Sequence, residues 1–166
     1  MSYDFSDLAV VMVEDNPHLR KLMKEILIGY NIRNVKAFGQ AEDMREELLT
    51  RPYDLAIIDW NMKPISGIEL VYWIRNNKNS PDKFLPIIMV SGHSERHRVE
   101  KARDAGVNEF IVKPLSGSSI YNKLVQLTDN PRPFVDTKHY FGPDRRRKNQ
   151  AELAKQARRN EDPKPE

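Results

Sequence analysis

The 166-residue sequence contains no cysteine, which excludes disulfides, thiolate zinc sites and iron–sulfur clusters. It also lacks any apolar run close to the roughly 20 residues that a membrane-spanning helix needs. Its first residues, MSYDFSDLAV, carry no basic stretch of the kind that opens a signal peptide. We therefore expect a soluble, cytoplasmic protein. Hydrophobic residues make up 39% of the chain, enough to build the core of one domain of ordinary size.

A positive excess is also missing from most of the chain, although the net charge is +3. Residues 1–130 contain 17 Lys and Arg against 18 Asp and Glu, whereas residues 131–166 contain 10 against 6. The basic character therefore belongs to the C-terminal tail. The larger part has no clustered positive charge of the kind that nucleic-acid-binding surfaces carry.

Five short runs of apolar and β-branched residues are present before the tail. They occupy residues 8–13 (LAVVMV), 34–38 (NVKAF), 54–59 (DLAIID), 86–91 (PIIMVS) and 108–112 (NEFIV). Three of them are nearly continuous, which is typical of strands that are covered on both faces. Apolar residues at three- and four-residue steps between and after these runs predict helices near residues 17–27, 41–49, 67–75, 97–106 and 118–127.

Strand and helix thus alternate five times along the chain. This order predicts an α/β fold with a doubly wound, five-stranded parallel sheet, right-handed crossovers and helices on both faces. In such folds ligands bind beyond the carboxyl ends of the strands, at the point where the strand order reverses. The polar residues that follow each strand are therefore the candidates for a functional site.

Polar side chains stand at the ends of four of these runs. Glu14 and Asp15 follow the first, Asp59 ends the third, Ser91 ends the fourth, and Lys113 follows the fifth. Taken singly, each is as typical of a turn or a helix cap as of a site. Their ordered placement at one predicted sheet edge favours a shared function.

The chemistry of this set is specific. Three carboxylates that converge would repel one another unless a cation neutralised them. Oxygen ligands without cysteine or histidine favour a hard ion, and we expect magnesium, with manganese as the alternative. A lysine and a hydroxyl on the far side suit an anion. Together these groups describe phosphoryl transfer to an aspartate.

The segments VVMVEDN, IIDWNM, IIMVSG and FIVKP resemble the dispersed motifs of CheY-like receiver domains, which belong to two-component response regulators. The resemblance covers about residues 8–128 and implies a flavodoxin-like (βα)5 fold with strand order 2-1-3-4-5. It implies that Asp59 accepts a phosphoryl group from a phosphohistidine donor. It also implies that Glu14, Asp15, Asp59 and the backbone carbonyl of Asn61 bind the metal.

By the same resemblance, Ser91 and Lys113 contact the phosphoryl group, and Phe110 takes the position of the aromatic switch. Tyrosine is frequent at that position, so here burial of the ring alone would report the state of the site. Asn61 and His93, each two residues after a motif residue, would flank the attacking water and tune dephosphorylation. For His93 an ordinary surface loop is an equal alternative.

Two further departures from the family pattern stand out. Glu14 replaces an aspartate that is often seen there. Lys63 precedes Pro64, whereas the usual proline comes one position earlier, which predicts a modified loop and an intact site.

The resemblance implies that phosphorylation repacks a surface on the fourth helix, fifth strand and fifth helix. That surface would include Arg96, Arg98, Lys101, Arg103, Tyr121 and Lys123. As a patch it suits an acidic or phosphorylated partner or a second copy of the chain. The alternative is an ordinary solvated helix face.

We divide the chain into a receiver domain, residues 1–128, and a basic tail, residues 129–166, largely flexible with a short marginal helix at 150–159. Aromatic and basic residues in the tail suggest docking on this receiver or on another protein. The candidates are Phe134, Tyr140, Phe141, Arg145, Arg146 and Arg147. A frayed, solubilising extension is the alternative.

The tail is too short for a DNA-binding output domain with its own core. We therefore expect a single-domain switch, not a conventional enzyme, that acts by protein contact or as part of a phosphorelay. Its expected partners are a sensor histidine kinase or histidine phosphotransferase and an unknown downstream protein, with a phosphorylation-dependent homodimer as a further candidate. The alternative is an adaptor whose tail binds nucleic acid or a partner under receiver control. An aspartyl-phosphate phosphatase generally has a second aspartate where this chain has Asn61.

Overall fold

The computed structural model describes residues 3–146. Its central sheet has five strands, β1 (Ala9–Val13), β2 (Asn34–Phe38), β3 (Leu55–Asp59), β4 (Ile87–Ser91) and β5 (Glu109–Val112), in the order β2-β1-β3-β4-β5. The pairings within this sheet are all parallel. Strands β3 and β4 are buried along their whole length. The predicted fold class and strand order are therefore confirmed.

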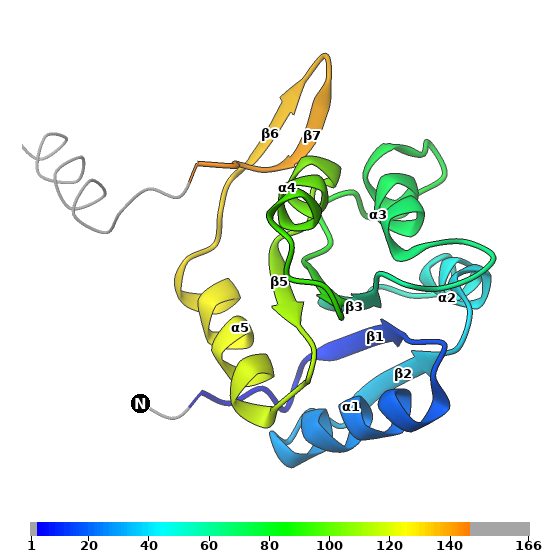
Figure 1. Cartoon of the computed structure of the whole chain (residues 1–166), viewed down its shortest axis with the longest axis vertical. Helices are drawn as coiled ribbons and strands as arrows, with labels where there is room; N and C mark the ends of the chain where they lie inside the picture. Colours follow the sequence, from blue (N-terminus) through cyan, green and yellow to red (C-terminus); the bar gives the residue numbers. More distant parts are fainter. Residues whose placement is uncertain (1–2, 147–166) are drawn as a thin grey trace, which may run out of the picture.

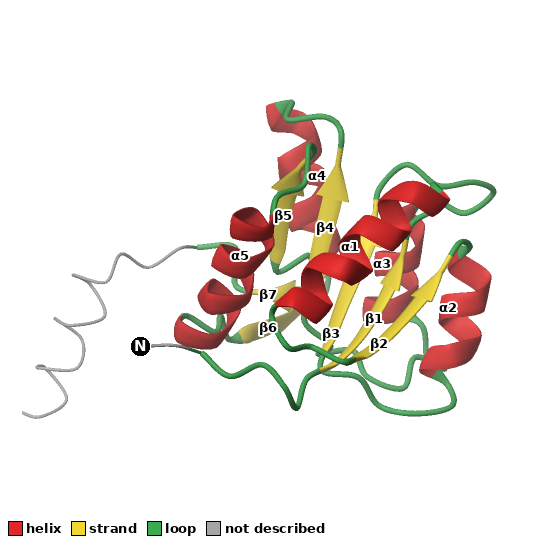
Figure 2. Cartoon of the chain, turned by 90° about the horizontal axis from the view of Figure 1, so that it is seen from below, coloured by secondary structure: helices red, strands yellow, loops and turns green. Residues whose placement is uncertain are grey.

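Five helices cover the two faces of this sheet (Figure 2). They are α1 (Pro17–Gly29), α2 (Ala41–Leu48), α3 (Gly67–Asn76), α4 (Arg96–Ala105) and α5 (Gly117–Asp129). One core cluster joins the sheet to α1 and α5 through residues such as Met23 and Leu124. The other joins it to α2, α3 and α4 through residues such as Met44, Leu70 and Ala102. The sheet is thus packed on both faces, between one layer formed by α1 and α5 and another formed by α2, α3 and α4.

Short polar residues fix where several helices begin. The side chain of Asn16 accepts hydrogen bonds from the backbone N–H groups of His18 and Leu19, as expected for an N-cap before Pro17. Ser66 and Ser116 each form a capping box at the start of α3 and α5. These caps place the helix starts at the carboxyl edge of the sheet, beside the candidate site.

The start of the tail forms an antiparallel hairpin that the sequence analysis did not expect. Strands β6 (Phe134–Thr137) and β7 (Tyr140–Pro143) pair with each other and project near the ends of α3 and α4 (Figure 1). The turn between them contains no glycine or asparagine, which removes the usual sequence signal of a hairpin. The predicted helix at 150–159 lies outside the described residues.

Two glycines let the hairpin approach the body of the protein. Gly106 ends α4 with a φ of 101°, in the left-handed region that favours glycine. A Cβ on Gly142 would lie 2.8 Å from the Cα of Gly106 and 2.6 Å from the Tyr140 hydroxyl. The hairpin backbone therefore packs directly on the end of α4. Within residues 3–146, no helix is both long and apolar enough to cross a membrane.

Candidate functional site

The carboxyl edge of the sheet brings together the residues that the sequence placed at strand ends. Glu14 follows β1, Asp59 ends β3, Ser91 ends β4 and Lys113 follows β5. The parallel register sets Asp59 beside Val90, and the N–H of Lys113 donates to the carbonyl of Ser91 at 2.8 Å. The predicted convergence at one edge is therefore present in the fold.

Three carboxylates form a tight acidic cluster there. Ligand oxygens of Glu14, Asp15 and Asp59 all lie within 4.8 Å of one another. Glu14 and Asp59 are each only 1% exposed, whereas Asp15 is exposed. Burial raises the pKa of both Glu14 and Asp59, although hydrogen bonding to Lys113 works in the opposite direction. Ionising the buried carboxyl groups of Glu14 and Asp59 therefore costs free energy.

Lys113 supplies the single lysine cation of this cluster. Its Nζ lies 2.9 Å from Glu14 Oε2 and 2.8 Å from Asp59 Oδ1. Burial would lower the pKa of Lys113, but the two carboxylates outweigh that effect and raise it. Lys113 thus pairs with two of the three carboxylates of the cluster.

The donor set fits a hard divalent cation. All three side chains offer oxygen ligands, and the Asp59 Oδ1 atom is buried without a well-directed hydrogen bond despite its ion-pair distance to Lys113. Exposed Asp15 leaves one side open to water or to an incoming phosphoryl group. These features match the carboxylate and open positions that Mg²⁺ prefers.

Close packing fixes the backbone around Asp59. Gly67, the first residue of α3, lies so near that a Cβ on it would stand 2.0 Å from the Asp59 carbonyl oxygen. On the other side, Arg20 donates to the carbonyl of Glu14 at 2.7 Å. The sequence pattern predicts neither contact, because only the three-dimensional packing determines what each residue faces.

Ser91, the hydroxyl that would contact an anion, lies outside the acidic cluster of Glu14, Asp15 and Asp59. Ser91 is buried, and its Oγ accepts a hydrogen bond from the backbone N–H of His93 at 3.2 Å. His93 and Asn61 are both exposed. The loop after Asp59 continues to Pro64, which follows Lys63 through a cis peptide bond, as Pro114 follows Lys113.

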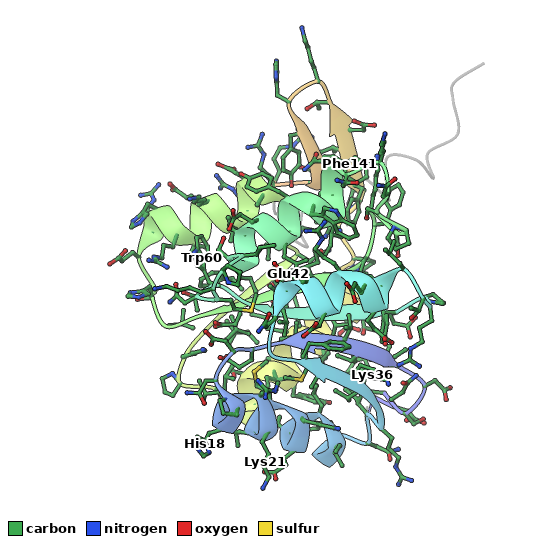
Figure 3. The ribbon with its side chains drawn as sticks, turned by 90° about the vertical axis from the view of Figure 1, so that its right-hand side faces the viewer. His18, Lys21, Lys36, Glu42, Trp60 and Phe141 are labelled. Atoms are coloured by element: carbon green, nitrogen blue, oxygen red, sulfur yellow. The ribbon has the colours of Figure 1, made fainter. Side chains whose placement is uncertain are left out.

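An aromatic contact joins the loop after Asp59 to the predicted switch position. The rings of Trp60 and Phe110 meet edge to face with their centroids 6.5 Å apart. Figure 3 labels Trp60, which is 8% exposed. Phe110 is half-buried and lines a hollow of about 410 Å³ between α4 and β5. The Trp60 ring thus connects the loop after Asp59 to the wall of this hollow.

The predicted interaction surface is only partly free. Arg96 pairs with Glu100 on the outside of α4, and Lys101 and Arg103 are exposed. Lys123 instead pairs with buried Glu109 at 2.9 Å.

Two other members of that surface make contacts away from the solvent. Tyr121 packs against Tyr30 and Phe5. Arg98 points toward the loop after Asp59, with its guanidinium carbon 5.3 Å from the centre of the Trp60 ring.

The tail aromatics face this protein's own receiver. Phe134 and Phe141 form a cluster with Phe84, with ring centroids 5.1–5.7 Å apart, and Figure 3 labels Phe141 at the hairpin. The Tyr140 hydroxyl donates to the carbonyl of Pro143 at 2.7 Å and also lies 3.3 Å from the carbonyl oxygen of Arg103 on α4.

Basic residues that follow the hairpin make ion pairs. Arg145 pairs with Asp104 at 2.9 Å, and Arg146 pairs with Asp144 at 3.2 Å. Arg147 lies outside the described residues.

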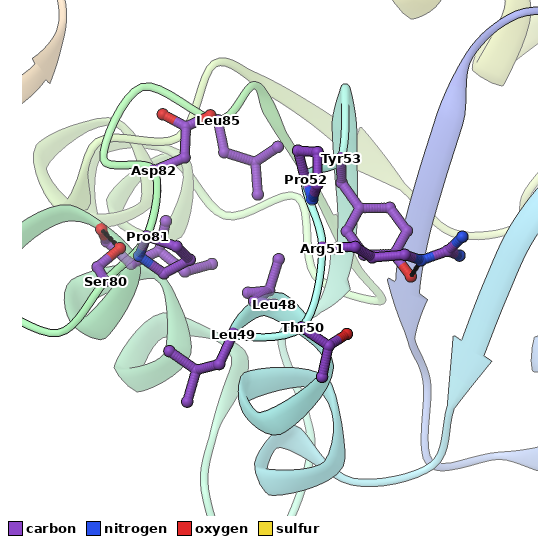
Figure 4. A pocket seen from close by; sticks show the side chains of 11 residues that line it. Leu48, Leu49, Thr50, Arg51, Pro52, Tyr53, Ser80, Pro81, Asp82 and Leu85 are labelled. Carbon is purple, nitrogen blue, oxygen red and sulfur yellow. Dashed lines mark hydrogen bonds between the residues drawn. The ribbon is translucent and has the colours of Figure 1, made fainter.

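A second hollow lies away from the acidic cluster. Its volume is about 280 Å³, and Figure 4 shows leucine and proline side chains around it, with Tyr53 and Arg51 at one side. Tyr53 donates to Glu47 at 2.5 Å, and burial raises the pKa of Tyr53 to about 12. None of the strand-end residues of the acidic cluster lines this hollow.

The sheet order places this protein in the flavodoxin-like class of α/β folds, and the acidic cluster lies at the edge where such folds bind ligands. Residues 10–125 match the model of the response regulator receiver domain, and the chain belongs to this family. Receiver domains of this family are phosphoacceptor switches in two-component signalling, and are generally not conventional enzymes.

Particular relatives are chemotaxis proteins. The chain is 28% identical over 118 residues to chemotaxis protein CheY-3 of Vibrio cholerae, covering 71% of this chain and 89% of that protein. It is 26% identical over 120 residues to chemotaxis protein CheY of Pseudomonas aeruginosa, covering 72% and 95%. Its fold is similar to the solved structure of Vibrio cholerae CheY4, with a TM-score of 0.65, 22% identity, and 72% and 98% coverage.

Proposed function

We propose that this protein is a cytoplasmic response regulator that accepts a phosphoryl group from phosphohistidine onto Asp59 with bound Mg²⁺. The observation that carries this proposal is the position of Asp59. It is buried at the carboxyl edge of the sheet, 2.8 Å from the Lys113 ammonium and grouped with the carboxylates of Glu14 and Asp15. A phosphoacceptor role uses all of these groups at once, which supports the proposal.

Glu14, Asp15, Asp59 and the carbonyl of Asn61 would hold the metal. When bound, Mg²⁺ offsets negative charge on phosphoryl oxygens, and Mn²⁺ suits the same ligands. Lys113 would move from its ion pair with Asp59 to the new phosphoryl oxygens, and the Ser91 hydroxyl would donate to another of them. Asn61 and His93 are both exposed, and they would control the access of water to the phosphoryl group.

The output would be a change in protein contacts. Ser91 and Phe110 lie on neighbouring strands, and Phe110 lines the hollow between α4 and β5. Movement of Ser91 toward the phosphoryl group would free space for the Phe110 ring and repack this face. A downstream protein, a histidine phosphotransferase or a second copy of the chain would then bind one state better than the other.

The tail aromatics pack on the receiver, which supports a tail that acts through the receiver surface. The adaptor alternative, in which the tail binds nucleic acid, depends on the basic run that begins at Arg145 and continues outside the described residues. Salt-dependent binding of DNA or RNA to the full chain, with and without Arg145→Ala and Arg146→Ala, separates the two functions.

The central test is incubation of the full chain with acetyl phosphate and Mg²⁺, followed by intact mass measurement. We expect one phosphate adduct on the wild type, none on Asp59→Asn and none when EDTA replaces Mg²⁺. Asp43→Asn is the matched control, because Asp43 is an exposed carboxylate on α2 away from the cluster. An adduct that persists in Asp59→Asn would contradict the proposal.

A further inference from the structure

Arg98 in the first turn of α4 reaches across to the residues that follow Asp59. Its Nη1 donates to Asn61 Oδ1 at 3.4 Å, and its guanidinium lies 5.3 Å from the centre of the Trp60 ring. Its Nε is 3.9 Å from Glu95 Oε2. The side chain is 24% exposed, against 92% for Arg96 two residues before it. Arg98 is therefore folded onto the edge of the site.

The chemistry of the two side chains fixes their orientation. A guanidinium has only hydrogen-bond donors, so the atom of the Asn61 amide that faces it is the oxygen. That oxygen is the only acceptor in the Asn61 side chain. While it accepts from Arg98, it is less available to accept a hydrogen bond from water.

Stacking on Trp60 holds the guanidinium in this place. A cation over an indole face is attracted to it, and Trp60 is itself buried and packed against Phe110. Glu95 adds an opposite charge on the outer side. Three neighbours thus restrict a side chain that would otherwise extend into solvent, as Arg96 does.

Loss of the phosphoryl group requires an oriented water beside Asn61. The water oxygen bonds to phosphorus, the bond between phosphorus and the Asp59 oxygen breaks, and its electron pair stays on the Asp59 carboxylate. The proton of the water leaves with inorganic phosphate. An Asn61 oxygen free to accept from that water would orient it for attack.

We propose that Arg98 is a positioning residue that lengthens the life of the phosphorylated state by occupying the amide oxygen of Asn61. The inference rests on the proposed phosphorylation of Asp59. It also gives α4 a role at the site itself. This helix carries the proposed output surface, and through Arg98 it also restrains Asn61, the residue beside the attacking water.

The test measures the half-life of the phosphate adduct on the full chain. Protein is phosphorylated with acetyl phosphate and Mg²⁺, the donor is removed by desalting, and the adduct is followed by intact mass in Mg²⁺ buffer. We expect Arg98→Ala to shorten the half-life about three- to tenfold, the range expected from losing one restraining hydrogen bond. Arg98→Lys, which keeps a cationic donor, should give an intermediate half-life.

A double-mutant cycle identifies the route of the effect. In an Asn61→Ala background, Arg98→Ala should change the half-life little, because the oxygen it controls is gone. Arg45→Ala is the matched control, since Arg45 also stacks on a tryptophan, Trp73, at 4.7 Å, and neither residue belongs to the acidic cluster or the loop after Asp59. This variant should keep the wild-type half-life.

Distinct results overturn the two proposals. An unchanged half-life in Arg98→Ala, or equal shortening with and without Asn61, removes the role of Arg98 while leaving Asp59 as the acceptor. Absence of any adduct on the wild type removes the proposed function and this inference with it. Thermal unfolding of each variant, followed by circular dichroism, separates these results from a loss of folded protein.

Discussion

At the scale of single residues, a fully buried guanidinium ties the end of α3 to two later segments. Arg75 donates to the carbonyls of Lys83, Leu85 and Gly106 and to Asn108 Oδ1, at 2.7–2.9 Å. Phe134 covers it from the hairpin, with its ring centre 5.0 Å from the guanidinium carbon. Burial lowers the pKa of Arg75 to about 10, so it stays charged at neutral pH.

Arg75→Met should therefore destabilise the protein by about 3–5 kcal/mol, because it leaves buried carbonyl oxygens without donors. Arg75→Lys should lose much of the same free energy, since one ammonium group cannot reproduce the planar fork of donors. Urea unfolding at pH 7 measures both variants. Arg33→Met, at an exposed arginine, is the control and should lie within about 0.5 kcal/mol of wild type. Equal stability of Arg75→Met and wild type would refute the account.

Residues of the site differed in how far the sequence could predict them. Glu14, Asp59, Ser91 and Lys113 stand directly at strand ends, so the parallel order alone places them at one edge. The contacts of Arg98 depend on how a long side chain folds over another element. No periodicity or motif encodes such a contact, because several rotamers of an arginine on the same helix would be compatible with the sequence pattern.

At the scale of elements, the alternation of continuous apolar runs with helical spacing predicted the five strands and five helices of the receiver. Asn16 caps α1 directly before Pro17, and Gly106 ends α4, which are residue types typical of these positions. The hairpin β6–β7 was not predicted because its strands are short and its turn lacks a typical turn sequence. Its stability depends on packing against Phe84 and α4, which are distant along the chain.

Gly142→Val should detach this hairpin from α4. Any Cβ at this position would lie 2.8 Å from the Gly106 backbone, and the larger valine should cost about 1–3 kcal/mol. Limited trypsin digestion should then cut faster after Lys138, which lies in the turn of the hairpin. Gly29→Ala is the control, because nothing lies within 4 Å of the added methyl, and helical alanine is favoured there. Unchanged cleavage of Gly142→Val would show that the hairpin does not need this contact.

At the scale of the whole molecule, the acidic cluster links folding stability to pH and, on the proposed function, to bound Mg²⁺. Burial raises the pKa values of Glu14 and Asp59 above their unfolded values. The stability that these two groups contribute is therefore present below the unfolded pKa and is lost as pH rises through the folded pKa. Ionising these two carboxylates therefore costs more free energy in the folded protein than in the unfolded chain.

Mg²⁺ should remove much of that cost, because it binds the folded cluster and not the unfolded chain. At a concentration tenfold above its dissociation constant, it should add about 1.4 kcal/mol, or roughly 2–6 °C in Tm. The gap between Tm in Mg²⁺ and Tm in EDTA should widen as pH rises from 4.5 to 7.5, since protons compete for the same oxygens at low pH. Scanning calorimetry at matched ionic strength measures this gap in Tm.

Asp15→Asn should close much of the gap, whereas Glu25→Gln, at an exposed carboxylate on α1, should leave it intact. A gap that stays constant across this pH range would mean that the stabilising ion binds away from Glu14 and Asp59.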